Sequence, residues 1–88
     1  MAVSLLKLDT GHYSLEFEPN DIERVAEALR EAYGPPAVKR WPIATSYSFN
    51  GVELTYQNEW DDPCLIAGDE SGDVVLKNLE KWLRHTPA

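Results

Sequence analysis

The chain has 88 residues, enough for one hydrophobic core and too few for two, so we expect a single domain over residues 1–88. Its one cysteine excludes an intramolecular disulfide and a cysteine-based metal cluster, and no stretch approaches the ~20 apolar residues of a membrane helix. The net charge of −7 repels phosphate backbones, which disfavours nucleic-acid binding. We expect a soluble, cytoplasmic protein that binds neither nucleic acid nor membrane.

The N-terminal part predicts a hairpin and then a helix. Turn-forming residues 9–12 separate a short apolar run at 3–8 from an alternating strand at 13–18. After Pro19, Asn20 can cap a helix while Glu23 reaches back to it, and Gly34 with two following prolines ends that helix. Its expected buried stripe consists of Ile22, Val25, Ala26, Leu29 and Tyr33.

Residues 41–60 predict a second hairpin, with residues 37–40 as the segment that leads into it. Asn50-Gly51 readily takes the positive φ angles of a type I′ turn, and this turn sets the register. The expected pairs are Phe49 with Val52, Tyr47 with Leu54, Thr45 with Tyr56, Ile43 with Asn58 and Trp41 with Trp60. One face is then mainly apolar, and the open polar face carries Ser46, Ser48, Glu53, Thr55 and Gln57.

A third consecutive strand is expected at 64–67, followed by a polar loop at 68–73 and a final helix. The buried stripe of this helix consists of Val75, Leu76, Leu79, Trp82 and Leu83. The order is therefore ββαβββα. It predicts an α+β fold with a five-stranded, mainly antiparallel sheet and two helices packed on one face.

Few residues suggest catalysis. His12 lies in a turn and His85 in the last turn of a helix, so we expect structural or solvent-exposed roles for both. Cys64 begins an apolar strand, and the acidic residues before it would raise its pKa, which disfavours a nucleophile. No glycine-rich phosphate loop is present, so we expect no cofactor and no enzymatic activity.

The loop at 68–73 partly resembles a calcium-binding loop. Asp69, Ser71 and Asp73 stand at alternate positions with Glu80 eleven residues after the first, but the position that requires glycine holds Val74. Capping of the final helix by Asp69 or Ser71, with Asp73 in its first turn, explains the same residues. Our main expectation is therefore that this loop holds no metal. The alternative function that stays open is a small-ligand or metal-binding domain that uses this loop.

Charge and aromatic residues provide the remaining signal. Between residues 41 and 76 the chain has seven acidic residues and no lysine or arginine. We expect the three tryptophans to pack together, and a partly exposed one beside these acids would anchor a protein partner. The predicted site for a basic protein partner consists of Glu59, Trp60, Asp61, Asp62, Asp69, Glu70 and Asp73. The alternative is that the charge only keeps the domain soluble.

The stretch FNGVELTYQNEWDDPCLIAGDESGDVVLKNLEKWL resembles small acidic bacterial proteins, some of them immunity proteins encoded beside polymorphic toxins. The likeness covers the last half of the chain: an aromatic hairpin, a short apolar strand and a glycine-containing loop before a final helix. It implies a non-enzymatic binder that masks a cationic partner. An enzyme subunit whose active site is completed by another chain is the third hypothesis.

Overall fold

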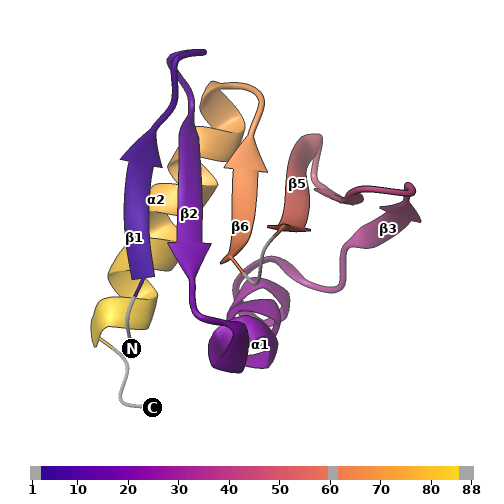
Figure 1. The fold of residues 1–88 in the computed structure, drawn as a ribbon. Helices are drawn as coiled ribbons and strands as arrows, with labels where there is room; N and C mark the ends of the chain where they lie inside the picture. The colour runs from indigo at the N-terminus through magenta and orange to yellow at the C-terminus, as the bar shows by residue number, and fades with distance from the viewer. Residues whose placement is uncertain (1–2, 60–61, 86–88) are drawn as a thin grey trace.

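The computed structural model describes residues 3–59 and 62–85, which form one antiparallel sheet and two α-helices (Figure 1). The elements are β1 (Val3–Lys7), β2 (Tyr13–Phe17), the single 3₁₀ turn η1 (Pro19–Asp21), α1 (Ile22–Tyr33), β3 (Ala37–Arg40), β4 (Thr45–Phe49), β5 (Val52–Glu59), β6 (Asp62–Ala67) and α2 (Glu70–His85). The strand order in the sheet is β1-β2-β6-β5-β4-β3. The predicted α+β class with an antiparallel sheet is confirmed.

The predicted number of strands is wrong, because the sheet has six strands and not five. Residues 37–40, expected as a lead-in, form β3 and pair with β4 from Ala37↔Ser48 to Arg40↔Thr45. All four side chains of β3 are exposed, so an edge strand of this kind carries no alternating apolar pattern. The order of elements is therefore ββαββββα.

The predicted turn of the central hairpin is confirmed, whereas the pairing predicted for the open end of the hairpin is wrong. Asn50 and Gly51 have φ angles of 49° and 78°, and the three expected pairs nearest the turn form between β4 and β5. Ile43 does not pair with Asn58, because β4 begins only at Thr45, and the pairing of β4 with β5 ends at Thr45↔Tyr56. The expected pair of Trp41 with Trp60 falls partly outside the described residues. Trp41 itself lies in the β3–β4 turn.

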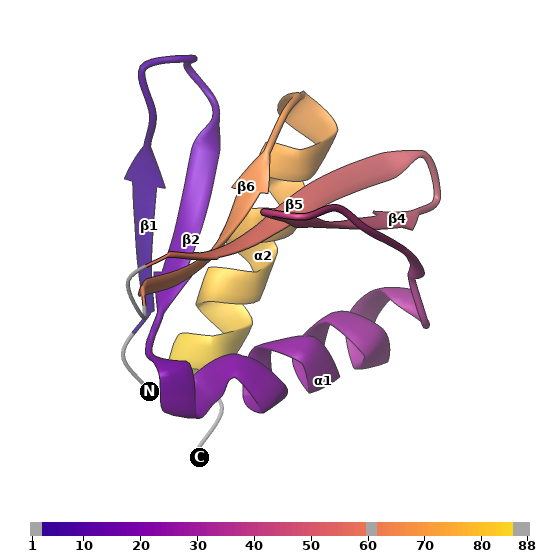
Figure 2. The same ribbon diagram turned by 45° about the vertical axis from the view of Figure 1, so that its right-hand side comes forward.

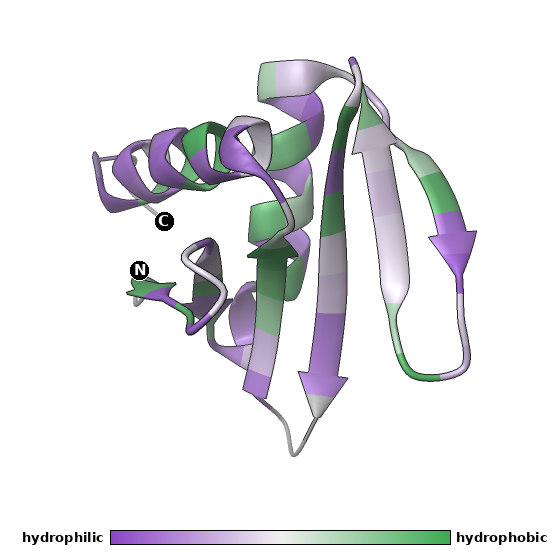
Figure 3. Cartoon of the chain, turned by 90° about the horizontal axis from the view of Figure 1, so that it is seen from above, coloured by the Kyte–Doolittle hydropathy of each residue, from purple (hydrophilic) through white to green (hydrophobic). Residues whose placement is uncertain are grey.

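The core lies between one face of the sheet and both helices (Figure 2). α2 packs across β1, β2, β6 and β5, and α1 packs mainly on α2. Both helices are amphipathic, with hydrophobic and hydrophilic segments alternating around them (Figure 3). The most deeply buried leucines come from the centre of the sheet and from α2: Leu15, Leu54, Leu76, Leu79 and Leu83.

The helix stripes are largely as predicted, except at one position in each helix, and the predicted cap of α1 is wrong. In α1, Ala28 is buried and Ala26 is exposed, so the stripe is turned slightly from the expected one. The expected Asn20 cap is also absent, since α1 follows directly from η1 and has no side-chain cap bond. In α2, Trp82 is 36% exposed and lies beside α1 residues.

Trp41 lies on the other face of the sheet, so the expected packing of Trp82 on Trp41 is wrong. The indole Nε1 of Trp41 donates a hydrogen bond to Ser46 Oγ at 3.3 Å, and Lys39 Nζ lies 4.4 Å from the centre of the Trp41 ring. Tyr47 lines the helix side, so the neighbouring Ser46 must point to the opposite face. The open polar face therefore has the predicted register, and Trp41 covers part of it.

A buried carboxylate joins the first hairpin to α2. Asp73 Oδ2 lies 2.8 Å from His12 Nδ1, and Asp73 Oδ1 accepts a hydrogen bond of 2.8 Å from the Tyr13 amide. Burial alone would raise the pKa of the Asp73 carboxyl. The hydrogen bonds from His12 and Tyr13 and the nearby charges of His12 and Lys77 outweigh burial and hold the pKa below its ordinary value. His12 therefore has the structural role that was expected for it.

The stability of the domain should depend on Asp73 and on pH. A carboxyl whose pKa is lowered by folding stabilises the native state above its ordinary pKa of ~3.9, and this stabilisation is lost as the pH falls through the folded-state pKa. We expect Asp73→Asn to lower the free energy of unfolding at neutral pH by about 1–3 kcal/mol. Urea unfolding between neutral and acidic pH tests this, with the exposed Glu70→Gln as control. An equal loss of stability on acidification in wild type and Asp73→Asn would contradict the assignment.

Candidate functional site: a groove between α1 and the sheet

The acidic residues expected to bind a partner are distributed over both ends of β6. Asp62 is exposed at the start of this strand, and Asp69 and Glu70 are exposed beyond its other end. At about 3.3 Å per residue, the strand separates the two groups by roughly 20 Å. Trp60 and Asp61 lie outside the described residues. The backbone of Glu59 pairs with that of Asp62.

Two of these acids already have structural partners. Asp73 is buried against His12 and Tyr13, so it does not contribute to an exposed surface. Asp69 Oδ1 accepts a hydrogen bond of 2.8 Å from the Gly72 amide and caps α2, as the sequence predicted. Engagement of a basic partner by the exposed acids stays a prediction.

Loss of the Asp69 cap should destabilise the domain. The carboxylate satisfies one free amide at the start of α2, so we expect Asp69→Ala to lower the free energy of unfolding by about 1 kcal/mol. Glu70→Ala is the matched control, because it removes a neighbouring exposed acid for which no cap bond is found among the described residues. Equal effects of the two substitutions in urea unfolding would show that charge, and not capping, is what matters.

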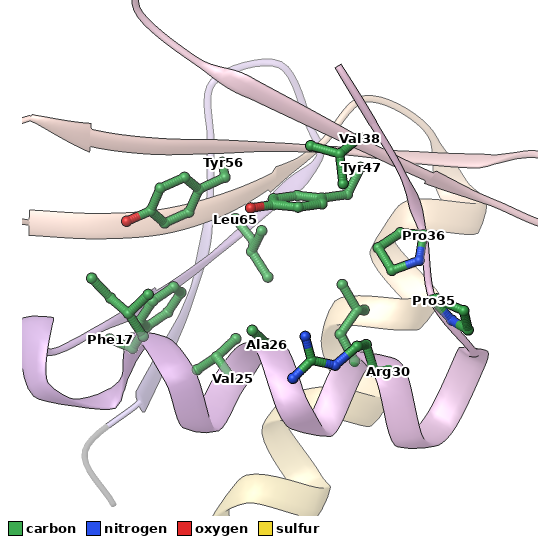
Figure 4. A pocket seen from close by; sticks show the side chains of 12 residues that line it. Phe17, Val25, Ala26, Arg30, Pro35, Pro36, Val38, Tyr47, Tyr56 and Leu65 are labelled. Atoms are coloured by element: carbon green, nitrogen blue, oxygen red, sulfur yellow. The ribbon is translucent and has the colours of Figure 1, made fainter. Parts of the chain in front are cut away.

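A groove with a volume of about 320 Å³ lies between α1 and the sheet (Figure 4). It is lined by residues from β2, α1, β3, β4, β5 and β6 and from the segment after α1: Phe17, Ile22, Val25, Ala26, Leu29, Arg30, Pro35, Pro36, Val38, Tyr47, Tyr56 and Leu65. Figure 4 shows the tyrosine rings opposite the α1 side chains, with the two prolines at one end. The groove is therefore built from segments that are far apart in the sequence.

Aromatic rings form much of its sheet wall. The Tyr56 ring centre lies 6.5 Å from that of Phe17 and 6.4 Å from that of Tyr47, the latter in an edge-on arrangement. Tyr47 pairs with Val38, and Tyr56 pairs with Leu65. Because directly paired residues project to the same face of a sheet, these four side chains must line one surface.

The end of α1 forms the opposite wall. Gly34, with a φ of 83°, donates its amide to the Arg30 carbonyl at 2.8 Å and ends the helix, and the two prolines then turn the chain toward β3. Ile22, Ala26 and Arg30 are four residues apart, so they follow one line along α1 and present it to the groove. Ile22 and Ala26 were expected in the buried stripe of α1, whereas Arg30 was not predicted to line a site.

The polar groups of the groove are two phenols and one guanidinium. Burial, and secondarily the neighbouring Tyr47, raises the pKa of Tyr56, so its hydroxyl is a neutral donor at physiological pH. Arg30 is exposed, and the described residues place no carboxylate within ion-pair distance of its guanidinium. No acidic residue lines the groove within the described part of the chain.

A second hollow, of about 390 Å³, lies between the two helices beside Trp82. Its described lining comes from α1 and α2 alone and includes Glu31 and Asn78, so the sheet provides no wall for it. The groove at the sheet has α1 on one side and aromatic and apolar side chains of the sheet on the other, and no acid lines it within the described residues. It is therefore the better candidate for a ligand site.

The other candidate reactive groups lie away from the groove. Partial burial raises the pKa of the Cys64 thiol, and Glu16 and Asp62 add to the shift against opposing hydrogen bonds from Ser14 and the Gln57 backbone. A neutral thiol is a weak nucleophile. His85 is exposed at the end of α2. Among residues 3–59 and 62–85, no three histidine, cysteine or acidic side chains gather where they could hold a metal ion.

Comparison of the chain with protein-family models, curated proteins and solved structures finds no match. Within the described residues, neither helix combines the length and apolar character needed to cross a membrane. The case for a function therefore rests on the geometry and chemistry of the groove.

Proposed function

We propose that the protein is a small-molecule-binding domain whose ligand lies in the groove between α1 and the sheet. The observation that carries this proposal is the composition of the groove: apolar and aromatic walls around about 320 Å³, with a few polar groups that can orient a ligand. Small-molecule sites in proteins have this composition and volumes from about 300 to 1,000 Å³. The ligand is a small, mainly apolar molecule.

Binding without catalysis agrees with the residues that line the groove. Besides the two tyrosines, the described lining has no side chain of the kinds that ordinarily act as nucleophile or general base, since histidine, cysteine, serine, aspartate and glutamate are all missing from it. The alternative left open by the sequence was a small-ligand or metal site in the loop from Asp69 to Asp73. The proposal moves that site to the groove, because Asp69 caps α2 and Asp73 is buried against His12.

The net charge of −7 and the exposure of Asp62, Asp69 and Glu70 support engagement of a basic protein partner as a second proposal. It involves surfaces other than the groove. The two functions are therefore compatible, and the groove proposal does not depend on the second one.

Filling the groove should weaken ligand binding. We expect a neutral apolar probe, N-phenyl-1-naphthylamine, to gain fluorescence on binding the wild-type protein, and Ala26→Phe to weaken that binding about tenfold or more, since the new ring occupies the groove. Val74→Phe is the matched control, because it adds the same ring at an exposed position of α2 that does not line the groove. Both positions are exposed, so both variants should fold.

The location of the probe is checked by the amide shifts of the ¹⁵N-labelled protein. The proposal expects the largest shifts at α1 and at Tyr47 and Tyr56, and small shifts on the exposed side of α2. Unchanged binding by Ala26→Phe, or shifts confined to other surfaces, would overturn the proposed function.

A further inference from the structure

We infer that the natural ligand of the groove is an apolar carboxylic acid, whose carboxylate is bound by Arg30 and whose apolar body lies against Tyr47 and Tyr56. This inference rests on the proposed function and specifies the ligand class. It begins from the observation that one of the twelve lining residues carries a charge, and that this charge is positive.

The guanidinium of Arg30 can accept an anionic partner. This guanidinium has no ion-pair partner among the described residues, whereas Arg84 contacts Glu80 at 3.5 Å and the Val3 carbonyl at 3.0 Å. Arg30 and Ala26 lie on the same line of α1, and Figure 4 shows the guanidinium beside Ala26 on the groove side of the helix. The fork of donors is therefore available to a molecule in the groove.

The chemistry of the guanidinium selects the head group. Its planar donors match the two oxygens of a carboxylate, and such bidentate, charge-assisted pairs are about twice as strong as neutral hydrogen bonds. Apolar walls on two sides lower the local dielectric, which strengthens the pair relative to one fully in water. A basic head group would be repelled, and a neutral one would leave the strongest donor of the groove unused.

The distribution of acids on α1 supports the same conclusion. Glu27 and Glu31 line a further small hollow beside Leu83 of α2, and neither of them lines the groove. Because the chain is strongly acidic overall, an anion is attracted only where a local cation is free of acidic neighbours. Among the described residues that line the groove, Arg30 is the one charged side chain, and no acid lines the groove with it.

The body of the ligand is defined by the tyrosines and the volume. The rings of Tyr47 and Tyr56 present flat apolar surface, and about 320 Å³ suits a compact aryl or short acyl group better than a long lipid chain. The side chain of Asn58 hydrogen-bonds to the Tyr56 hydroxyl, while no hydrogen-bond partner of the Tyr47 hydroxyl is found among residues 3–59 and 62–85. Tyr47 can therefore donate to a polar atom on the ligand body.

The test uses two probes with the same ring, 2-naphthoate and 2-naphthalenemethanol, titrated by calorimetry and by amide shifts near neutral pH. We expect wild type to bind the acid at least about tenfold more tightly than the alcohol. Arg30→Gln should remove this preference, because it weakens binding of the acid at least about tenfold more than binding of the alcohol. Arg30→Lys should keep part of it, because it retains the charge but not the fork.

Lys81→Gln is the control, because it makes the same change in net charge at an exposed position of α2 outside the groove. It should leave both affinities unchanged, and circular dichroism checks the folding of every variant. If the two probes bind wild type equally, or Arg30→Gln keeps the preference for the acid, the carboxylate inference is wrong and the groove proposal stands. If neither probe shifts the groove amides, the proposed function itself fails.

Discussion

The packing of α2 on the centre of the sheet is the interaction on which the rest of the structure depends. Leu76, Leu79 and Leu83 are almost completely buried, and they lie in one core with Leu15 of β2 and Leu54 of β5. Burial of each such side chain contributes about 1.5–3 kcal/mol, so this contact is a main source of stability in a domain of this size. The Asp69 cap and the Asp73 link then fix where α2 begins and which strands it crosses.

The position of α2 leaves the other half of the sheet incompletely covered. Six strands spaced about 4.8 Å apart span roughly 24 Å, whereas two helices packed about 8–10 Å apart cover about 20 Å. Since α2 packs on β1, β2, β6 and β5, α1 alone faces the remaining part, and it packs mainly on α2. The groove is the space left along β4 and β5 by this mismatch, and the sixth strand, β3, extends its wall through Val38.

The parts of the fold that could be predicted from sequence are those determined by local patterns. Asn50-Gly51 fixed the β4–β5 turn and its nearest pairs, and the apolar spacing of α2 predicted its buried side except at Trp82. β3 could not be predicted, because an exposed edge strand has no buried face to produce an alternating pattern. His12 and Asp73 are 61 positions apart in the sequence, so no local sequence pattern predicts their contact.

The candidate site could be predicted from local sequence patterns even less than the fold could. Acidic residues are close in sequence, but β6 separates Asp62 from Asp69 in space, and folding buries Asp73. The groove is formed by residues from five strands and α1, so no sequence motif predicts it. The spacing placed Ile22 and Ala26 in the expected buried stripe, but without the sheet opposite it nothing in the sequence indicated that Arg30 continues this line along an open groove.

The composition of the walls explains how such a groove remains stable when no ligand covers it. Tyrosine combines a large apolar ring with a hydroxyl that water can solvate, so Tyr47 and Tyr56 tolerate partial exposure better than leucine or phenylalanine would. The methylene stem of Arg30 can likewise lie along apolar surface while its head stays in water. Both tyrosines lie in paired strands of the sheet, and prolines follow α1, so the backbone of the walls is restricted before binding. A ligand would then lose little affinity to ordering the protein, which is the condition for tight binding in a small volume.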